Sequence, residues 1–343
     1  MSIGTKVKLG VSATLIVLVI LASNPEAVGQ VLSNVDPGLI GLVVMLYFFN
    51  LVVKAYRWGV LMRQSGHTVP FRTIFTAFSL SQAINNLIPG RIVGETSRIV
   101  EVNSKEGVSM GRGLATVLTE RVMDFVLLTL LAVTSLFLLL TNIIEELRGY
   151  LIFMVALMVL ANVFFIYVLA RPALIVRLGA RGAMIIERTV KGEKGERYAA
   201  KMMSSVSSFN EALAFRGHWR PMVWASVLTI FIWINEIIRL FLIIEALGVH
   251  VSIMAVIATT SLASLSSVML SAGSGNVVMS SAVLSAAGLN ANVAATAGLL
   301  SALTSIWLSV PVSLIAMLFD HYYKTSSPLG KDKEIKEEER GFH

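Results

Sequence analysis

The chain contains no cysteine, so disulfides and thiolate metal sites are excluded. Its five histidines are scattered along the sequence, and no two of them have the spacing of metal ligands. There is also no phosphate-binding loop ending in Gly-Lys-Ser or Gly-Lys-Thr with which to hydrolyse a nucleotide. From these absences we expect no metal centre and no cofactor.

Charged residues are scarce as well. They make up 14% of the 343 residues, whereas 55% are hydrophobic, and the mean hydropathy is +0.76. Such a chain is too apolar for a soluble globule. The sequence predicts one all-α integral membrane domain over residues 1–325. Its six apolar runs, read as full membrane spans, are approximately 9–22, 39–61, 114–140, 151–170, 222–246 and 291–319.

The positions of the basic residues predict how these spans are oriented. Of the 28 Lys and Arg residues, all but Arg121, Arg148 and Arg239 lie in segments that the predicted spans place on one face. Lys54 and Arg57, toward the end of the second span, are counted with that face. The positive-inside rule makes that face cytoplasmic, with both termini inside the cell. We therefore expect a multi-pass protein of the plasma membrane. The net charge of +7 follows from this topology, and without an aromatic and basic repeat we expect no nucleic-acid binding.

The first run has a second interpretation. It is short and follows Lys6 and Lys8, so a cleaved signal peptide is an alternative.

Two further apolar stretches do not fit as full spans. If residues 74–88 crossed the bilayer, the basic residues from Arg91 to Arg112 would lie outside. Residues 252–288 carry no charge, contain Gly273 and Gly275, and connect two spans on the outer face. We expect two re-entrant helical hairpins from opposite faces, although a pair of tilted spans is an alternative for the second. Irregular backbone at membrane depth needs surrounding protein or a water-filled cavity, as in many transporters.

The cytoplasmic connection over residues 171–220 contains one helical pattern. Met202, Val206, Phe209 and Leu213 recur at helical spacing opposite polar residues, which predicts an amphipathic helix. This helix either lies on the inner leaflet or packs on the protein's own cytoplasmic face. We expect a charged loop over residues 191–196 before it, and a charged, disordered cytoplasmic tail over residues 326–343.

Ionisable residues inside the spans are candidate functional residues, because a lone charge at a helix centre costs about 2.5–3.5 kcal/mol on insertion scales. Glu236 and Arg239 are three residues apart and share a helical face. They either line a polar cavity or neutralise each other and fix helix packing. Glu120, Arg121 and Asp124 form a second cluster, which lies within the span or at the inner interface.

A third polar group surrounds the break after residue 88. Pro89 and Gly90 end one helix, and Arg91, Glu95 and Arg98 then fall on one side of the next. Two guanidinium groups beside a helix start suit a phosphate group, and contact with anionic lipid is the alternative. The predicted substrate-binding residues are Asn85, Asn86, Arg91, Glu95, Arg98, Arg121, Glu236, Arg239 and Asn276. The candidates for ion coupling are Glu120, Asp124 and Glu236.

These residues resemble a known family, the flippase-like membrane domain of bacterial lysyl-phosphatidylglycerol synthases and its stand-alone relatives in bacteria and archaea. The resemblance rests on NNLIPGRIVGE at residues 85–95 with Arg98, on ATVLTERVMD at residues 115–124, and on Tyr56-Arg57-Trp58. It covers essentially the whole chain. One departure is visible at residues 271–278, SAGSGNVV, where family members commonly have a Pro-Gly-Gly-x-Gly stretch followed by an acid.

The resemblance implies movement of lipids between leaflets, and the synthase activity of the family belongs to a separate soluble domain. We therefore expect a lipid translocase, and not an enzyme, that carries an anionic phospholipid or a polyprenyl-phosphate-linked lipid. The expected partners are lipids with anionic headgroups. One alternative is a non-catalytic membrane subunit that recruits a glycosyltransferase or another lipid-modifying enzyme. Others are an ion-coupled small-solute transporter and an enzyme acting on lipid-linked sugar. A homo-oligomer stays open.

Overall fold

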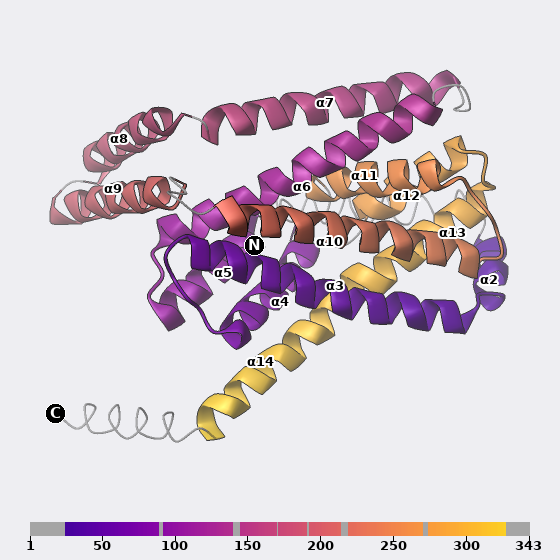
Figure 1. Cartoon of the computed structure of the whole chain (residues 1–343), viewed down its shortest axis with the longest axis horizontal. Helices are drawn as coiled ribbons and strands as arrows, with labels where there is room; N and C mark the ends of the chain where they lie inside the picture. The colour runs from indigo at the N-terminus through magenta and orange to yellow at the C-terminus, as the bar shows by residue number, and fades with distance from the viewer. Residues whose placement is uncertain are drawn as a thin grey trace.

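The computed structural model describes residues 25–88, 92–139, 145–169, 171–190, 192–213, 219–269 and 274–326. The elements of these residues are all helical, which confirms the predicted all-α class. The helices, shown in Figure 1, are α2 (Pro25–Ser33), α3 (Pro37–Gln64), α4 (Phe71–Leu87), α5 (Ile92–Glu106), α6 (Met110–Leu139), α7 (Glu145–Leu169), α8 (Pro172–Thr189), α9 (Glu193–Leu213), α10 (Trp219–Ala246), α11 (Ile253–Met269), α12 (Ser274–Ala286), α13 (Ala291–Ala302), the π-helical turn η1 (Leu303–Trp307) and α14 (Leu308–Ser326).

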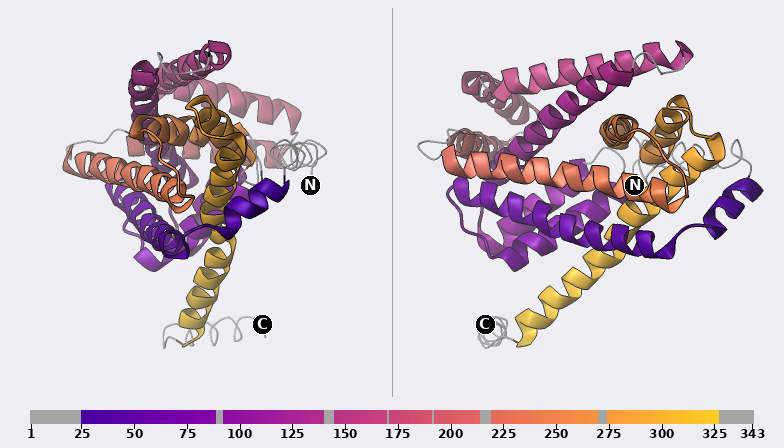
Figure 2. Two further views of the ribbon diagram at one scale, coloured as in Figure 1. Left: turned by 90° about the vertical axis from the view of Figure 1, so that its right-hand side faces the viewer. Right: turned by 45° about the vertical axis from the view of Figure 1, so that its right-hand side comes forward.

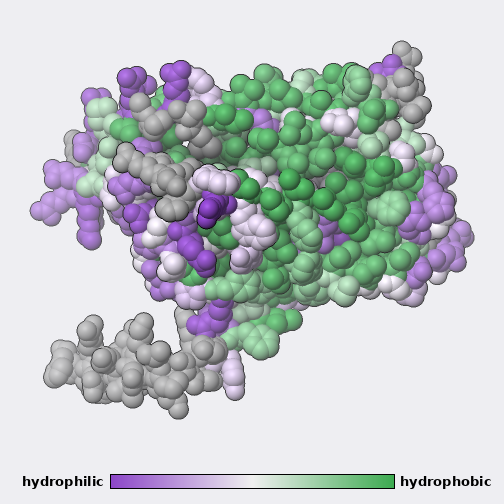
Figure 3. Space-filling view, in the orientation of Figure 1, coloured by the Kyte–Doolittle hydropathy of each residue, from purple (hydrophilic) through white to green (hydrophobic). Residues whose placement is uncertain are grey.

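In the described residues, 5 stretches are long and apolar enough to cross a membrane. They are Pro37–Gln64, Met110–Leu138, Arg148–Tyr167, Trp219–Ala246 and Ala291–Asp320, and they coincide with five of the predicted spans. The remaining predicted span, residues 9–22, and the tail after residue 326 lie outside the described residues. Figure 3 shows a broad apolar band between two polar ends. This is the surface of a multi-pass membrane protein.

Two pairs of shorter helices complete the bundle, α4 with α5 and α11 with α12. The first pair lies toward the end of the molecule where α3 finishes, and the second toward the opposite end, where α10 finishes (Figures 1 and 2). The predicted helix breaks agree with these bounds. Helix α4 ends before Pro89, since proline disfavours the interior of a helix, and α12 begins directly after Gly273.

Helices α4 and α5 pack closely together at Gly94. A Cβ atom on this residue would lie 2.2 Å from Oδ1 of Asn85 and 2.4 Å from the backbone oxygen of Ser81. Only glycine allows this approach. The close crossing brings the following residues of α5, Glu95 and Arg98, into the interior of the bundle.

The last span contains an irregular turn. Pro311 in α14 has no N–H group, and its ring conflicts with the carbonyl four residues earlier, at Trp307. The π turn η1 ends at that residue and accommodates the conflict. As a result, the backbone oxygens of Thr304 and Ile306 are available to side chains of other helices.

Helix α9 carries the predicted amphipathic pattern, and its apolar face packs on the protein itself. Phe209 is buried with Ala115 of α6, and Gly111 of α6 lies against the backbone of Ser205. The structure therefore favours the second of the two predicted arrangements. The predicted loop over residues 191–196 is wrong from Glu193 onward, because α9 begins there. Helix α8, whose Gly179 and Gly182 pack against Val206 and Met202 of α9, is not predicted from the sequence.

Candidate functional site

A cavity of about 160 Å³ lies between the long helices and the two helix pairs. The helices that contribute lining residues are α3, α4, α6, α10, α11, α12 and α13, together with η1. Amides, hydroxyls and a few apolar side chains form part of the wall. The charged side chains that line it are Lys54, Arg57, Glu120, Arg121, Asp124 and Glu236.

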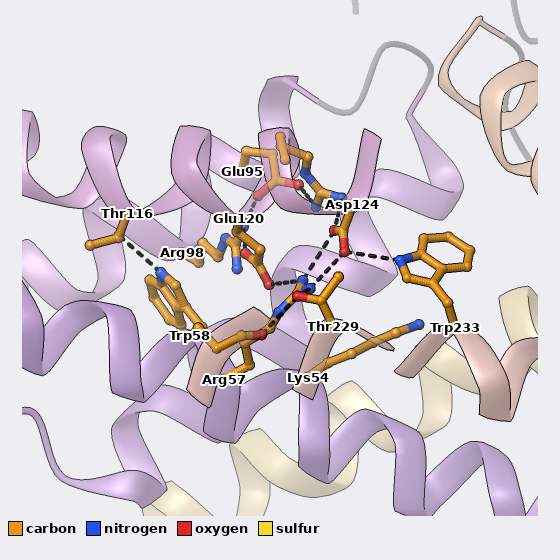
Figure 4. A network of polar contacts seen from close by, with 12 residues as sticks. Lys54, Arg57, Trp58, Glu95, Arg98, Thr116, Glu120, Asp124, Thr229 and Trp233 are labelled. Atoms are coloured by element: carbon orange, nitrogen blue, oxygen red, sulfur yellow. Dashed lines mark hydrogen bonds and ion pairs between the residues drawn. The ribbon is translucent and has the colours of Figure 1, made fainter. Parts of the chain in front are cut away.

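Arg57 of α3 connects three helices at one side of this cavity (Figure 4). Its Nη1 donates to Oδ1 of Asp124 at 2.6 Å, and its Nη2 donates to Oε1 of Glu120 at 2.7 Å. Nη1 also donates to Oγ1 of Thr229 on α10 at 2.7 Å. The Arg57 side chain is only 2% exposed. A guanidinium group held by two carboxylates is a strong, directional contact, so Arg57 fixes α3 against α6 and α10.

Arg98 of α5 contacts one of these two carboxylates, that of Glu120. It is fully buried, and its guanidinium carbon lies 4.7 Å from the ring centroid of Trp58 and 5.1 Å from that of Phe78. Its Nη2 donates to Oε2 of Glu120 at 2.7 Å and also pairs with Glu95. Arg98 does not line the cavity. Its position suits a residue that holds Glu120 in place.

Arg121 of α6 faces the cavity and pairs with Glu95 of α5. Glu95 also accepts from Nδ2 of Asn85 at 3.3 Å. On the far side, Nε1 of Trp233 donates to Oδ1 of Asp124 at 3.0 Å. Three cations and three carboxylates thus form a network of balanced charge, which we call the arginine network. Its members are Arg57, Arg98, Arg121, Glu95, Glu120 and Asp124.

Glu236 of α10 organises a second group of charges. Its Oε1 accepts from Nζ of Lys54 at 2.6 Å and from Nδ2 of Asn50 at 2.8 Å. Its Oε2 accepts from Nη1 of Arg239 at 2.8 Å, and Nη2 of Arg239 donates to the Thr304 backbone oxygen of the π turn at 3.0 Å. We call Lys54, Glu236 and Arg239 the glutamate group. One carboxylate here serves two cations.

Two amides bring the inner ends of the helix pairs into the wall. Nδ2 of Asn86, in the last turn of α4, donates to Oγ of Ser309 at 2.8 Å. Nδ2 of Asn276, in the first turn of α12, donates to Oγ of Ser301 at 3.1 Å. Both amides line the cavity. Each helix pair is therefore fixed to the last span at the depth of the cavity.

The structure brings most of the residues predicted from the sequence to this cavity, although their role in binding stays a prediction. Arg91 lies outside the described residues. Those that contact lining side chains without lining the cavity themselves are Glu95, Arg98 and Arg239. Those that line it are Asn85, Asn86, Glu120, Arg121, Asp124, Glu236 and Asn276.

Lys54, Arg57 and Asn50 are members of the site that the sequence analysis missed. Counting Lys54 and Arg57 as charges of a cytoplasmic segment is wrong, because both lie within the span Pro37–Gln64 and are 21% and 2% exposed. A signal was present in their spacing. The three residues recur at intervals of four and three, which places them on one helical face inside an apolar run.

A family model described as the lysylphosphatidylglycerol synthase transmembrane region matches residues 7–313. The chain belongs to this family. The resemblance stated from the motifs is therefore confirmed, and the matched range contains every charged residue of the arginine network and of the glutamate group.

Individual relatives agree with this assignment. A UPF0104 membrane protein of Methanothermobacter thermautotrophicus is 26% identical over 306 residues, which cover 87% of this chain and 90% of the relative. One of Methanocaldococcus jannaschii is 27% identical over 300 residues, covering 84% and 87%. Glycosyltransferase AglD of Haloferax volcanii is 26% identical over 115 residues, only 34% of this chain and 18% of AglD. No solved structure matches the chain.

Proposed function

We propose that this protein is a lipid translocase that moves an anionic phospholipid or a polyprenyl-phosphate-linked lipid between the two leaflets. The observation that carries the proposal is a charged, hydroxyl-lined cavity among helices whose outer surfaces are apolar. An ionic headgroup in hydrocarbon loses its water without replacement. In the cavity, side chains can replace that water while the tails stay in the bilayer.

In the proposed mechanism the two helix pairs lead from the cavity toward the two leaflets. In this proposal α4 with α5 and α11 with α12 are re-entrant hairpins from opposite faces, and their broken inner ends supply Asn86 and Asn276 to the wall. Discontinuous helices meeting at a polar site are a common plan of transporters. The end that carries α8 and α9 is cytoplasmic, because the basic connections lie there.

The size of the cavity indicates which part of the lipid it holds. Pockets for whole small-molecule ligands occupy about 300–1,000 Å³, and this cavity of about 160 Å³ is smaller. It suits a headgroup, with the tails outside. Its carboxylates are each held by arginine or lysine, which suits fixed charges better than general acid chemistry. We therefore propose transport and not catalysis, driven by the lipid gradient or by an ion.

A second candidate function is a membrane subunit that recruits a glycosyltransferase. The observation that favours it is the similarity to part of AglD, whose name describes a glycosyltransferase. Co-purification of a glycosyltransferase from native membranes, without lipid exchange by the purified protein, would support this function instead.

The experiment for the proposed function is leaflet exchange in proteoliposomes. Fluorescent phosphatidylglycerol and a fluorescent polyprenyl-phosphate lipid are placed in both leaflets, and an impermeant quencher reports how fast the inner probe reaches the outside. We expect the protein to raise the exchange rate of at least one anionic probe above that of empty liposomes. The proposal would be contradicted if every probe exchanged at the same rate with the protein as in empty liposomes.

A further inference from the structure

The charges of the arginine network and of the glutamate group, taken together, do not cancel. The arginine network holds three cations and three carboxylates, whereas the glutamate group holds Lys54, Arg239 and Glu236. Five cations therefore face four carboxylates, and within the described part of the chain one positive charge has no carboxylate of its own. A buried charge is unfavourable unless an opposite charge accompanies it. A bound anion with a single charge would complete the balance.

The excess charge is most accessible at Lys54. Its side chain lines the cavity and is 21% exposed, whereas the Arg239 side chain is 3% exposed and does not line it. An ammonium group has three donors. Among the described residues Lys54 donates to one atom, Oε1 of Glu236. Lys54 therefore retains donors for a ligand oxygen. An anionic ligand would compete with the Glu236 carboxylate for the Lys54 ammonium group.

Ser280 of α12 supplies an independent sign of a missing partner. It lines the cavity, is 1% exposed, and its Oγ has no hydrogen-bond partner in the described structure. Buried hydroxyl groups are nearly always hydrogen-bonded. A ligand oxygen in the cavity would satisfy Ser280 as well as Lys54.

We propose that the cavity selects a lipid headgroup with one net negative charge, a phosphodiester, and that the difference between Lys54 and Glu236 sets this preference. The inference rests on the proposed function and narrows its substrate class. A phosphodiester carries one charge, whereas a phosphomonoester carries about −1.5 to −2 at neutral pH. Choline or lysine on the phosphodiester adds positive charge that cancels or reverses the single negative one. A phosphomonoester would therefore add more negative charge than the one excess cation needs, and a choline or lysine headgroup would add too little.

Two substitutions shift the net charge of these groups in opposite directions, and combining them restores it. Lys54→Gln removes the excess, Glu236→Gln raises it to two, and the double substitution restores one. Arg63→Gln is the matched control, since Arg63 lies on the same helix α3 but is exposed at its end. Each protein is purified in detergent, and its melting temperature is measured with the short-chain lipids phosphatidylglycerol, phosphatidic acid and phosphatidylcholine. Leaflet exchange of the same three headgroups is measured in proteoliposomes.

We expect the wild-type protein and the Arg63→Gln variant to bind phosphatidylglycerol about tenfold more tightly than the other two lipids, since one charge at contact distance is worth at least that in a partly buried site. Glu236→Gln should prefer phosphatidic acid, Lys54→Gln should lose the preference for either anion, and the double variant should regain that of the wild type. If Glu236→Gln does not fold, Lys54→Gln and the double variant still carry the test.

The two proposals fail in different ways. If these proteins bind lipids with the predicted charge preferences but exchange no lipid, the proposed translocase is wrong and the headgroup site is supported. Exchange without a charge preference, or a preference that the Lys54 and Glu236 variants do not move, would overturn the phosphodiester site and keep the translocase.

Discussion

Replacing Glu120 with glutamine tests whether the arginine network holds the helices together. Glu120 is 1% exposed, and each of its carboxylate oxygens accepts from one guanidinium group at 2.7 Å, from Arg57 of α3 and from Arg98 of α5. Glutamine has one acceptor oxygen and a donor amide. One arginine would then face a donor, and the network would hold three cations and two carboxylates.

The expected loss is large because the carboxylate is buried, with the Glu120 side chain 1% exposed, and pairs with two arginines. Removing one partner of a buried ion pair costs about 3–5 kcal/mol, and we predict a fall of that size in the free energy of unfolding of Glu120→Gln. The matched control is Glu211→Gln on α9. Glu211 pairs with Arg112 at 3.3 Å, but its side chain is 62% exposed, so the loss should stay below about 1 kcal/mol.

The assay is reversible unfolding by SDS titration of the purified protein in mixed detergent micelles, followed by circular dichroism. The reasoning is refuted if the Glu120 and Glu211 variants lose the same free energy. In that case the contacts of the arginine network would not contribute to the packing of α3, α5 and α6.

Other substitutions test single contacts. Gly94→Ala should lower the free energy of unfolding by about 1–3 kcal/mol, because its methyl group would meet atoms at 2.2 and 2.4 Å, whereas Gly41→Ala, with nothing within 4 Å, should be neutral or slightly stabilising in the same titration. Trp233→Phe keeps an aromatic ring but removes the N–H that donates at 3.0 Å, and should cost about 1.5–3 kcal/mol; an unchanged titration would argue against that hydrogen bond. Since the chain has no cysteine, a cysteine at Leu178 and one at Arg181 can be compared on α8. Leu178 is apolar and 53% exposed, so we expect lipid to cover it and the cysteine at this position to react more slowly with a polar maleimide in membranes. Equal rates at the two positions would contradict a contact between α8 and lipid.

The spans could be predicted because a bilayer imposes strict demands on sequence. Each crossing needs about 20 apolar residues, and runs such as 114–140 and 222–246 meet this requirement without knowledge of any tertiary contact. The π turn before Pro311 could not be placed in the same way. Proline indicates that a regular helix is disturbed, but which carbonyls turn outward depends on donors from other helices, here Arg239 and Asn86.

The site was only partly predictable for a similar reason. Glu236 and Arg239 are neighbours on one helix, so their spacing alone indicates an ion pair, and the structure has that pair at 2.8 Å. Lys54 contacts the same carboxylate from a position 182 residues away in the sequence. The burial of Arg98 likewise depends on two aromatic rings from other helices. Such contacts follow from the packing of the bundle and have no local pattern.

The position of Lys54 and Arg57 near the end of an apolar run explains why the sequence alone places them in a cytoplasmic segment. Near the end of an apolar run, a basic residue can either extend to the interface or turn inward. Here the side chains of Lys54 and Arg57 turn inward because they pair with the carboxylates of Glu120, Asp124 and Glu236. Those carboxylates come from α6 and α10.

The most direct test of the central claim, that the charged cavity carries lipid headgroups, is leaflet exchange by Arg239→Gln beside Arg220→Gln. Both arginines lie on α10, but Arg239 is 2% exposed within the glutamate group, whereas Arg220 is exposed in the first turn. With equal amounts of folded protein in the liposomes, we predict that Arg239→Gln loses exchange of the anionic probe and that Arg220→Gln keeps it. Full exchange by Arg239→Gln would contradict the account.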